Sequence, residues 1–254
     1  MRCLALPESV PCGVEAWLLE LDLWKPVSDS DLALLSEDEH IRVLRFRQHQ
    51  DRVRSVVTRA ALRRLLAGRL MIPPDELRFV VNPYGKPRLY DYLGMEFNVS
   101  HSGCFALIAL STSGQVGVDI EYGHRAIDAK SLSTYVFSTL ERQSALQTAE
   151  DFIERWVAKE SVLKAVGLGI SEHLQAVSVL PSDSEGYEEG YEIRHDHPEW
   201  GGIQAWSLSV PDGYAAALAL QPNGTAPCSR KGSENVRGVP VCGRVRNGPI
   251  ANCK

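Results

Sequence analysis

The sequence predicts an α/β (α+β) protein built as a pseudo-dimer of two similar halves. Strand-like and helix-like segments alternate along its 254 residues. A strand–turn–strand pattern also occurs twice, about 110 residues apart. FNVS (97–100) aligns with WSLS (206–209), and GCFALIAL (103–110) aligns with GYAAALAL (213–220). Such a repeat is typical of a duplicated unit, although two apolar hairpins can also be similar by chance.

Hydrophobic periodicity predicts the elements of the first half. Apolar residues recur at helical spacing through its longest segment, and Pro73 and Pro74 follow where a helix would have to end. The order is a buried strand (14–23), two short capped helices (29–46), a long helix (50–70), a strand (77–81), and a run of three strands separated by turns (97–122).

In the second half, helical patterns come first and strand patterns close the half. We expect helices at 128–146 and 148–166 and strands at 176–180, 191–195 and within 205–220. Beyond residue 221 the chain is rich in Pro, Gly, Asn, Ser and Cys without periodicity. The predicted divisions are therefore an N-terminal half (1–115), a C-terminal half (116–222) and a disordered basic tail (223–254).

Composition is ordinary for a globular protein, at 44% hydrophobic and 23% charged residues. No apolar run approaches the roughly 20 residues that a membrane span needs. The N-terminal segment is too weakly apolar for a signal peptide, so we expect a cytoplasmic protein. The six cysteines show no metal-ligand spacing, and we expect free thiols.

Residues 40–70 are strongly basic, with nine arginines against one acid, Asp51, in a chain of net charge −5. Such a helix face can be merely solvated, or it can line a nucleic-acid groove. Aromatic residues that would stack on bases are sparse there, since only Phe46 is present. A small polyphosphate or an acidic partner protein fits this segment better than DNA.

Two acidic clusters suggest phosphate chemistry. Asp119 and Glu121 in VGVDIEY share one face of a predicted strand. Glu160 and Lys164 in RWVAKESVLKAVG lie one helical turn apart. Three converging carboxylates would repel one another without a cation, and Mg²⁺ prefers oxygen ligands. Taken separately, each cluster could also be an ordinary surface feature, because Glu–Lys pairs at this spacing are common on helices.

Other candidates lie in the segments SHSG and GKP. Ser100 and His101 end a strand, but adjacent strand residues point to opposite faces, which argues against a nucleophile–base pair. His101 could be a core histidine or a donor to a phosphate. Lys86 lies in a rigid turn, where it could be solvated or bind an anion.

The segments FNVSHSG, VGVDIE and RWVAKESVLKAVG, in this order, resemble the 4′-phosphopantetheinyl transferases of the two-halved, surfactin-synthetase-activating type. The resemblance implies a pseudo-dimer with coenzyme A bound between its halves. It also implies transfer of phosphopantetheine from coenzyme A to a serine of an apo acyl or peptidyl carrier protein, with release of adenosine 3′,5′-bisphosphate. The N-terminal half would then bind coenzyme A, and the C-terminal half would carry the magnesium and catalytic residues.

The resemblance assigns roles position by position. The magnesium ligands would be Asp119, Glu121 and Glu160. The catalytic residues would be Glu160, Lys164 and His101. Coenzyme A would be bound by Arg42, Arg54, Ser55, Lys86, Ser100, His101 and Lys164. The implied partners are coenzyme A and carrier proteins, with neither nucleic acid nor membrane, and the protein would be a monomer.

Two other readings remain open from the sequence. A non-catalytic protein that binds coenzyme A or a carrier would show binding without turnover. A metal-dependent phosphodiesterase using the same acids would release nucleotide without any carrier.

Overall fold

The structure is a computed structural model that describes residues 1–123, 129–143, 148–168, 173–182 and 190–223. The predicted tail lies outside these residues from position 224 onward. No helix in the described part of the chain is long and apolar enough to cross a membrane. Cys12 and Cys104, two of the cysteines within the described ranges, are free thiols, as predicted.

The first half contains the predicted elements and two additional short strands. Its strands are β1 (Arg2–Cys3), β2 (Val14–Glu20), β3 (Phe79–Val81), β4 (Pro87–Leu89), β5 (Glu96–Ser102) and β6 (Phe105–Ser111). Its helices are α1 (Asp29–Leu32), α2 (Glu37–Leu44) and α3 (His49–Leu70), with a 3₁₀ turn at Pro74–Glu76. Neither β1 nor β4 has enough residues to show an alternating pattern in the sequence.

The second half begins with β7 (Gly114–Tyr122), so the predicted boundary at 115/116 falls inside this strand. The segment expected to be helical over 128–146 contains two short helices, because Ser138 and Glu141 form a capping box that starts a new helix. The helices are α4 (Ala129–Val136), α5 (Thr139–Gln143) and α6 (Ala149–Val166), with 3₁₀ turns at Leu174–Ala176 and Pro198–Trp200. The remaining strands are β8 (Val177–Pro181), β9 (Gly190–His195), β10 (Gln204–Ser207) and β11 (Tyr214–Pro222).

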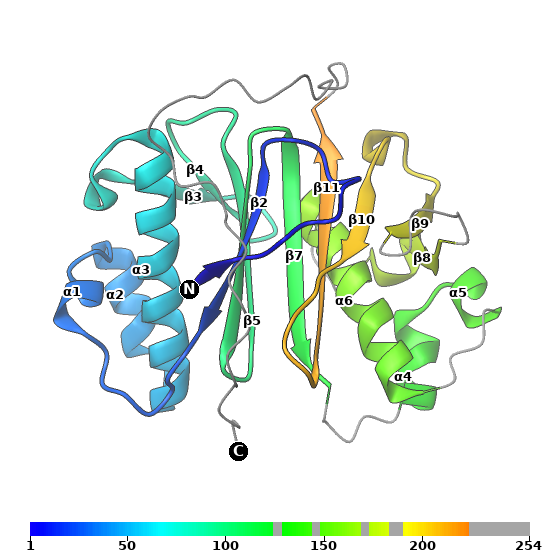
Figure 1. Cartoon of the computed structure of the whole chain (residues 1–254), viewed down its shortest axis with the longest axis horizontal. Coiled ribbons are helices and arrows are strands. Elements are labelled where there is room, and N and C mark those ends of the chain that lie inside the picture. Colours follow the sequence, from blue (N-terminus) through cyan, green and yellow to red (C-terminus); the bar gives the residue numbers. More distant parts are fainter. Residues whose placement is uncertain (124–128, 144–147, 169–172, 183–189, 224–254) are drawn as a thin grey trace.

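Two antiparallel sheets form the centre of the molecule (Figure 1). Their strand orders are β1-β2-β6-β5 and β7-β11-β10-β9-β8, and β3 and β4 form a separate pair. In each half a hairpin, β5–β6 or β10–β11, pairs with the first long strand, β2 or β7. Each half also has one long helix, α3 or α6. The predicted pair of similar α/β halves is therefore confirmed.

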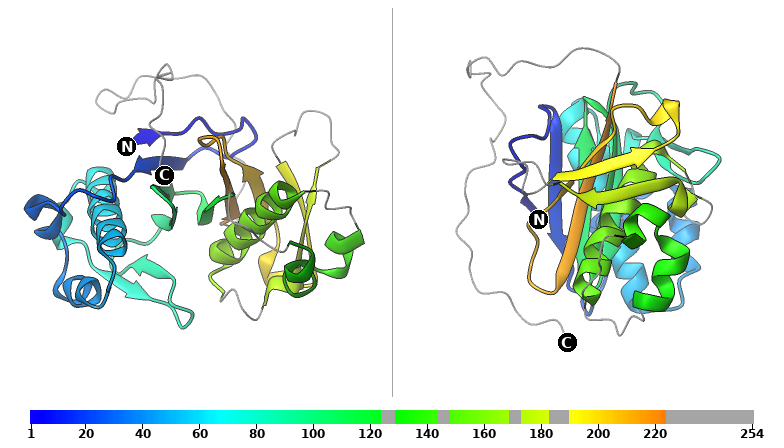
Figure 2. Two further views of the ribbon diagram at one scale, coloured as in Figure 1. Left: turned by 90° about the horizontal axis from the view of Figure 1, so that it is seen from below. Right: turned by 90° about the vertical axis from the view of Figure 1, so that its right-hand side faces the viewer.

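The two sheets pack against each other, and each long helix covers the outer face of its own sheet (Figures 1 and 2). Along each strand, successive side chains point alternately into the core between the sheets and into the core beneath the helix. On β6, Leu107 and Ala109 face the other sheet, whereas Ala106 and Ile108 face α3. Apolar side chains on both faces explain why these strands have continuous apolar sequences.

The repeat is real in topology, but its alignment in the sequence is wrong in register. That alignment matches Leu107 with Ala217, yet Leu107 faces the partner sheet while Ala217 faces α6. A slip of one residue turns every side chain of a strand to its other face. Because both faces are buried, the apolar pattern does not reveal the slip.

Gly117 sets the distance between β7 and α6. A Cβ atom at this position would lie 2.0 Å from the carbonyl oxygen of Ser161 and 2.4 Å from the nitrogen of Ala165. Both are backbone atoms, so the strand and the helix touch here without an intervening side chain. This contact fixes Asp119, two residues along β7, against Glu160 and Lys164 on α6.

Four arginines of α3 pair with acids from other elements of the first half. Arg63 is almost fully buried and donates to Glu39 and to the carbonyl oxygens of Pro74 and Leu77. Arg59 also pairs with Glu39, Arg64 with Asp31, and Arg69 with Glu15. Much of the basic charge in this segment therefore stabilises the fold.

Candidate active site

The candidate site lies where β5 of the first half runs beside β7 of the second. Here the strands are joined through side chains. Asn98 accepts a hydrogen bond from the Val118 amide at 2.9 Å. Ser100 donates to Asp119 at 2.6 Å, and Ser102 donates to Glu121 at 2.8 Å. These three residues occupy alternate positions on β5, so one polar face of this strand meets the acidic face of β7.

Lys164 links this strand junction to α6. Its ammonium lies 2.5 Å from Oδ1 of Asp119 and 3.2 Å from the Ser100 hydroxyl. It also lies 3.9 Å from Oε2 of Glu160, one helical turn earlier. Asp119 is 3% exposed, so its main compensation for losing solvent is this ion pair. The structure thus brings together Ser100, Asp119, Glu160 and Lys164, as the sequence predicted.

Glu160 is a buried carboxylate with a strongly perturbed acidity. Burial raises the pKa of Glu160 to about 7, and the negative charge of Asp119 adds to the rise. Lys164 opposes the rise, and Glu121 adds a smaller contribution to it. A carboxylate with this pKa can both take and give a proton near neutral pH.

The chemistry of these acids fits a divalent cation. Oδ2 of Asp119 is buried and has no hydrogen-bond partner among the described residues. Together with the mutual repulsion that raises the Glu160 pKa, this bare oxygen indicates a site short of positive charge. The side chains nevertheless do not form a finished cage, because no group of three His, Cys, Asp or Glu in the described ranges is gathered tightly enough to hold a metal. The assignment of Asp119, Glu121 and Glu160 as magnesium ligands stays a prediction.

Four of the predicted coenzyme A residues line one cavity of about 270 Å³ between α2, α3 and β5. They are Arg42, Arg54, Ser55 and His101. In the same wall, the Thr58 hydroxyl and one guanidinium nitrogen of Arg59 are buried without a hydrogen-bond partner among the described residues. The lining holds three arginines, Arg42, Arg54 and Arg59, against the carboxylates of Glu39 and Asp51, so it keeps a net positive charge and unused donors.

Arg54 is held in this cavity by its neighbours, and His101 lies beside it. Arg54 donates to the carbonyl oxygen of Gly103 at 2.9 Å and pairs with Asp51 at 2.8 Å. Burial lowers the pKa of His101, and the positive charges of Arg54 and Lys164 lower it further. A neutral imidazole at pH 7 carries one N–H that can donate to an anion.

Lys86 is the one predicted coenzyme A residue that joins neither the acidic cluster nor the cavity. Its ammonium donates to two backbone carbonyl oxygens, those of Ala165 on α6 at 2.9 Å and Val116 on β7 at 3.2 Å. Burial lowers the pKa of Lys86 to about 8, and the charge of Glu96 opposes this shift. Its role in binding coenzyme A stays a prediction.

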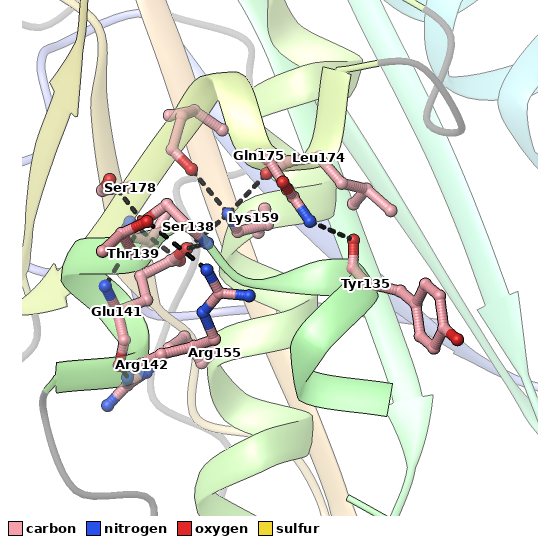
Figure 3. A network of polar contacts seen from close by, with 12 residues as sticks. Tyr135, Ser138, Thr139, Glu141, Arg142, Arg155, Lys159, Leu174, Gln175 and Ser178 are labelled. Carbon is pink, nitrogen blue, oxygen red and sulfur yellow. Dashed lines mark hydrogen bonds and ion pairs between the residues drawn. The ribbon is translucent and has the colours of Figure 1, made fainter. Parts of the chain in front are cut away.

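A buried ion pair stabilises the helix that carries Glu160 and Lys164 (Figure 3). Lys159 donates to Glu141 on α5 and to the carbonyl oxygens of Leu174 and Val177, all within 2.6 Å. Glu141 also accepts from the Ser138 and Val179 amides. Lys159 and Glu141 are fully buried, and this network attaches α5 and β8 to α6.

We expect Lys159→Met to lower the free energy of unfolding by about 3–5 kcal/mol, because the variant leaves Glu141 buried without its cation. Urea denaturation would measure this loss. The control is Glu192→Gln, which breaks an exposed pair with Arg194 and should change stability little. Equal effects in the two variants would contradict the buried ion pair.

Sequence reasoning missed Asn98, Ser102, Lys159 and Glu141. Asn98 and Ser102 could have been predicted, because FNVSHS has a polar residue at every second position. Such a polar strand face is a natural partner for the acidic face of VGVDIE. The Lys159–Glu141 pair carried none, because the two residues belong to different helices and nothing in the sequence indicates their contact.

Comparisons with known proteins agree with this geometry. Residues 115–219 match the family model of the 4′-phosphopantetheinyl transferase superfamily. Residues 22–113 match the model described as 4′-phosphopantetheinyl transferase, N-terminal. The two matches meet close to the start of β7, where the second half of the fold begins.

Individual relatives cover most of the chain. The protein slr0495 of Synechocystis sp. is 39% identical over 178 residues, covering 67% of this chain and 70% of its own length. The 4′-phosphopantetheinyl transferase HetI of Nostoc sp. is 32% identical over 222 residues, covering 84% of this chain and 90% of its own. The 4′-phosphopantetheinyl transferase Sfp of Bacillus subtilis is 26% identical over 162 residues, covering 61% of this chain and 72% of its own.

Proposed function

The chain belongs to the 4′-phosphopantetheinyl transferases, and from this premise we propose which of its residues carry the reaction and how. The enzyme transfers the 4′-phosphopantetheine group of coenzyme A to a serine of an apo acyl or peptidyl carrier protein. The observation that carries the mechanism is the contact of Lys164 with Asp119, beside Glu160, at the junction of the two halves.

The reaction exchanges one phosphorus–oxygen bond for another. The serine hydroxyl attacks the β-phosphate, which bears pantetheine, and its oxygen forms a new bond to that phosphorus. The bond between this phosphorus and the oxygen shared with the α-phosphate breaks, and adenosine 3′,5′-bisphosphate leaves with the electron pair. The protein must therefore accept one proton from serine and stabilise negative charge on both phosphates.

Glu160 is our candidate for the base that accepts the serine proton. Without a bound cation, burial holds its pKa at about 7, so a large fraction of Glu160 is already ionised at neutral pH. A cation on its carboxylate would lower that pKa and keep the group ionised, ready to accept a proton. Lys164 would donate to the phosphate oxygens as charge develops on them, and Ser100 and His101 would add hydrogen bonds. In the structure the Lys164 ammonium is already ordered by Asp119 and Ser100, which reduces its reorganisation during the reaction.

Mg²⁺ is the cofactor we propose, held by Asp119, Glu121 and Glu160. When bound, it would neutralise the pyrophosphate charge and polarise the phosphorus that is attacked. Ser100 and Ser102 orient the carboxylates of Asp119 and Glu121 through the hydrogen bonds already described. The second half thus supplies the acids, and the first half supplies the hydroxyls that fix them.

The cavity lined by Arg42, Arg54, Ser55 and His101 is our proposed site for the adenosine 3′-phosphate end of coenzyme A. Two guanidinium groups suit a phosphate dianion, and the buried Thr58 hydroxyl and Arg59 nitrogen offer further donors. We further propose the surfactin-synthetase-activating subtype, a monomer that acts in the cytoplasm without nucleic acid.

Intact-mass spectrometry of an apo carrier protein, incubated with this enzyme, coenzyme A and Mg²⁺, tests the proposed function. We expect the carrier to gain one phosphopantetheine, and EDTA to abolish the gain. Coenzyme A binding without any gain across several carriers would favour a non-catalytic binding protein. Nucleotide release without a carrier would favour a phosphodiesterase. The relatives favour neither of these alternatives, because they are named as transferases.

We expect Asp119→Asn to weaken the magnesium response, because the neutral amide loses the charge that attracts the cation. Mg²⁺ should raise the thermal unfolding midpoint of the parent protein, through preferential binding to the folded state, and raise that of the variant much less. Turnover at saturating Mg²⁺ should fall roughly a hundredfold. Glu20→Gln, at the exposed end of β2, is the control. A normal magnesium titration of Asp119→Asn would refute the ligand assignment.

A further inference from the structure

The turn between β3 and β4 is docked onto the end of α6, across the junction between the halves. Asn82 organises this turn, since its side-chain oxygen accepts from the Tyr84 and Lys86 amides at 2.9 Å. Its backbone amide donates to the carbonyl oxygen of Lys86, and its carbonyl oxygen accepts from the Gly85 amide. Gly85 has a φ of +84°, which the turn requires and which glycine adopts without strain.

This turn supplies two donors to the C-terminal end of α6. The side-chain amide of Asn82 donates to the carbonyl oxygen of Gly167 at 2.8 Å, and the Lys86 ammonium donates to that of Ala165 at 2.9 Å. Carbonyl groups in the last turn of a helix lack intrahelical partners and carry partial negative charge, so a cation and an amide stabilise them. Lys86 also donates to Val116 on β7 at 3.2 Å, which ties strand and helix together.

Ala165 and Gly167 follow closely after Lys164, the residue that reaches Asp119. Lys164 is the residue immediately before Ala165, and its ammonium contacts Asp119 on β7. The Lys86 ammonium thus binds the last turn of α6 and strand β7, which are the two elements that Lys164 also connects. The Lys86 ammonium donates to these two backbone carbonyl oxygens. It does not line the cavity that contains Arg42, Arg54, Ser55 and His101.

We propose that Lys86 is a positioning residue, which holds the last turn of α6 against β7 so that Lys164 meets the reacting phosphates, and that it is not a ligand of coenzyme A. The proposal rests on the proposed transferase function. It assigns Asn82 the supporting part, because Asn82 orders the turn and donates to the carbonyl oxygen of Gly167, the residue that caps the helix.

Steady-state kinetics and calorimetric coenzyme A binding separate the two roles. In Lys86→Met, positioning predicts a kcat at least about tenfold lower, with Kd and KM for coenzyme A within about threefold of the parent. A phosphate ligand predicts the reverse, a Kd roughly tenfold or more higher with a smaller change in kcat. Lys86→Arg, whose guanidinium can donate to two carbonyl oxygens, should recover part of kcat. The matched control is Arg88→Met, which removes an exposed positive charge two residues along and should change neither constant.

A double variant tests whether Lys86 acts through Lys164. Adding Lys86→Met to Lys164→Ala should cost little further turnover, because the group being positioned is already absent. A purely structural loss would lower turnover by the same factor in both backgrounds and would overturn the proposal. So would a raised Kd with unchanged kcat, or parent-like constants in Lys86→Met.

Hydrogen exchange keeps the test independent of catalysis. Lys86→Met should speed exchange of the amides in the last turn of α6, whereas Arg88→Met should not. If the parent protein neither binds coenzyme A nor modifies carriers, the proposed function fails, while faster exchange would still show the tie. Unchanged exchange in Lys86→Met would overturn the positioning role whatever the enzyme's activity.

Discussion

Lys164→Ala should lower kcat by roughly 10²–10³-fold while coenzyme A still binds. Lys164 is the single cation that the structure places against Asp119 and near Glu160, within the described residues. Its loss removes the donor that would meet charge developing on the transferring phosphate. Rates of carrier modification, followed by intact-mass spectrometry, and calorimetric binding of coenzyme A would measure the two effects separately.

The controls for this prediction address folding and charge. Lys25→Ala removes a lysine whose side chain is 77% exposed and should leave turnover unchanged. Because Lys164→Ala also leaves Asp119 without its ion pair, thermal unfolding should be recorded alongside activity. Turnover within threefold of the parent, in a folded Lys164→Ala protein, would exclude Lys164 from the chemistry.

Gly117→Ala should destabilise the protein by roughly 3 kcal/mol or more, although it adds a single methyl group. That methyl would lie 2.0 Å from the Ser161 carbonyl oxygen, and a backbone atom inside a helix cannot move aside without shifting the helix. Moving α6 from β7 would also separate Lys164 from Asp119, so turnover should fall with stability. Urea denaturation and carrier-modification rates would record both losses.

Gly68→Ala is the matched control, since it makes the same chemical change in the other long helix. Gly68 lies exposed in α3, and a Cβ there would meet nothing within 4 Å. The helix should gain about 0.5–1 kcal/mol, because alanine loses less backbone entropy than glycine on folding. Equal stability of Gly117→Ala and the parent would contradict the close contact between β7 and α6.

The order of the long elements could be predicted from the sequence because each has a local cause. The apolar period of residues 50–70 and the two prolines that follow are read directly from neighbouring residues, and α3 ends at Leu70 as expected. The strand pairings could not be read this way. In the apolar strands β6 and β11 both faces are buried, so the sequence contains no alternation that would fix which residues meet the helix.

The sequence predicted those contacts of the candidate site that join residues of the same strand or the same helix. Asp119 and Glu121 share a strand face, and Glu160 and Lys164 share a helix face, so spacing alone paired them. The joining of the two clusters depends on Gly117, whose role appears only when the helix is placed on the strand. Which arginines of the 40–70 segment stabilise the fold could not be predicted either, because partners such as Glu15 and Asp31 come from distant parts of the chain.

The packing of the two similar halves shows how a small enzyme can contain an active site whose buried charges lower its stability. On β2, the row of residues that faces the long helix includes Trp17 and Leu19, which add to the apolar core beneath α3. On β7 the corresponding row contains Gly117 and Asp119, which give that helix a close contact and a buried charge. Natural proteins commonly trade stability for activity. Here the first half keeps the apolar bulk beneath its long helix while the second half carries the buried charge, so two similar halves divide demands that a single half would have to reconcile.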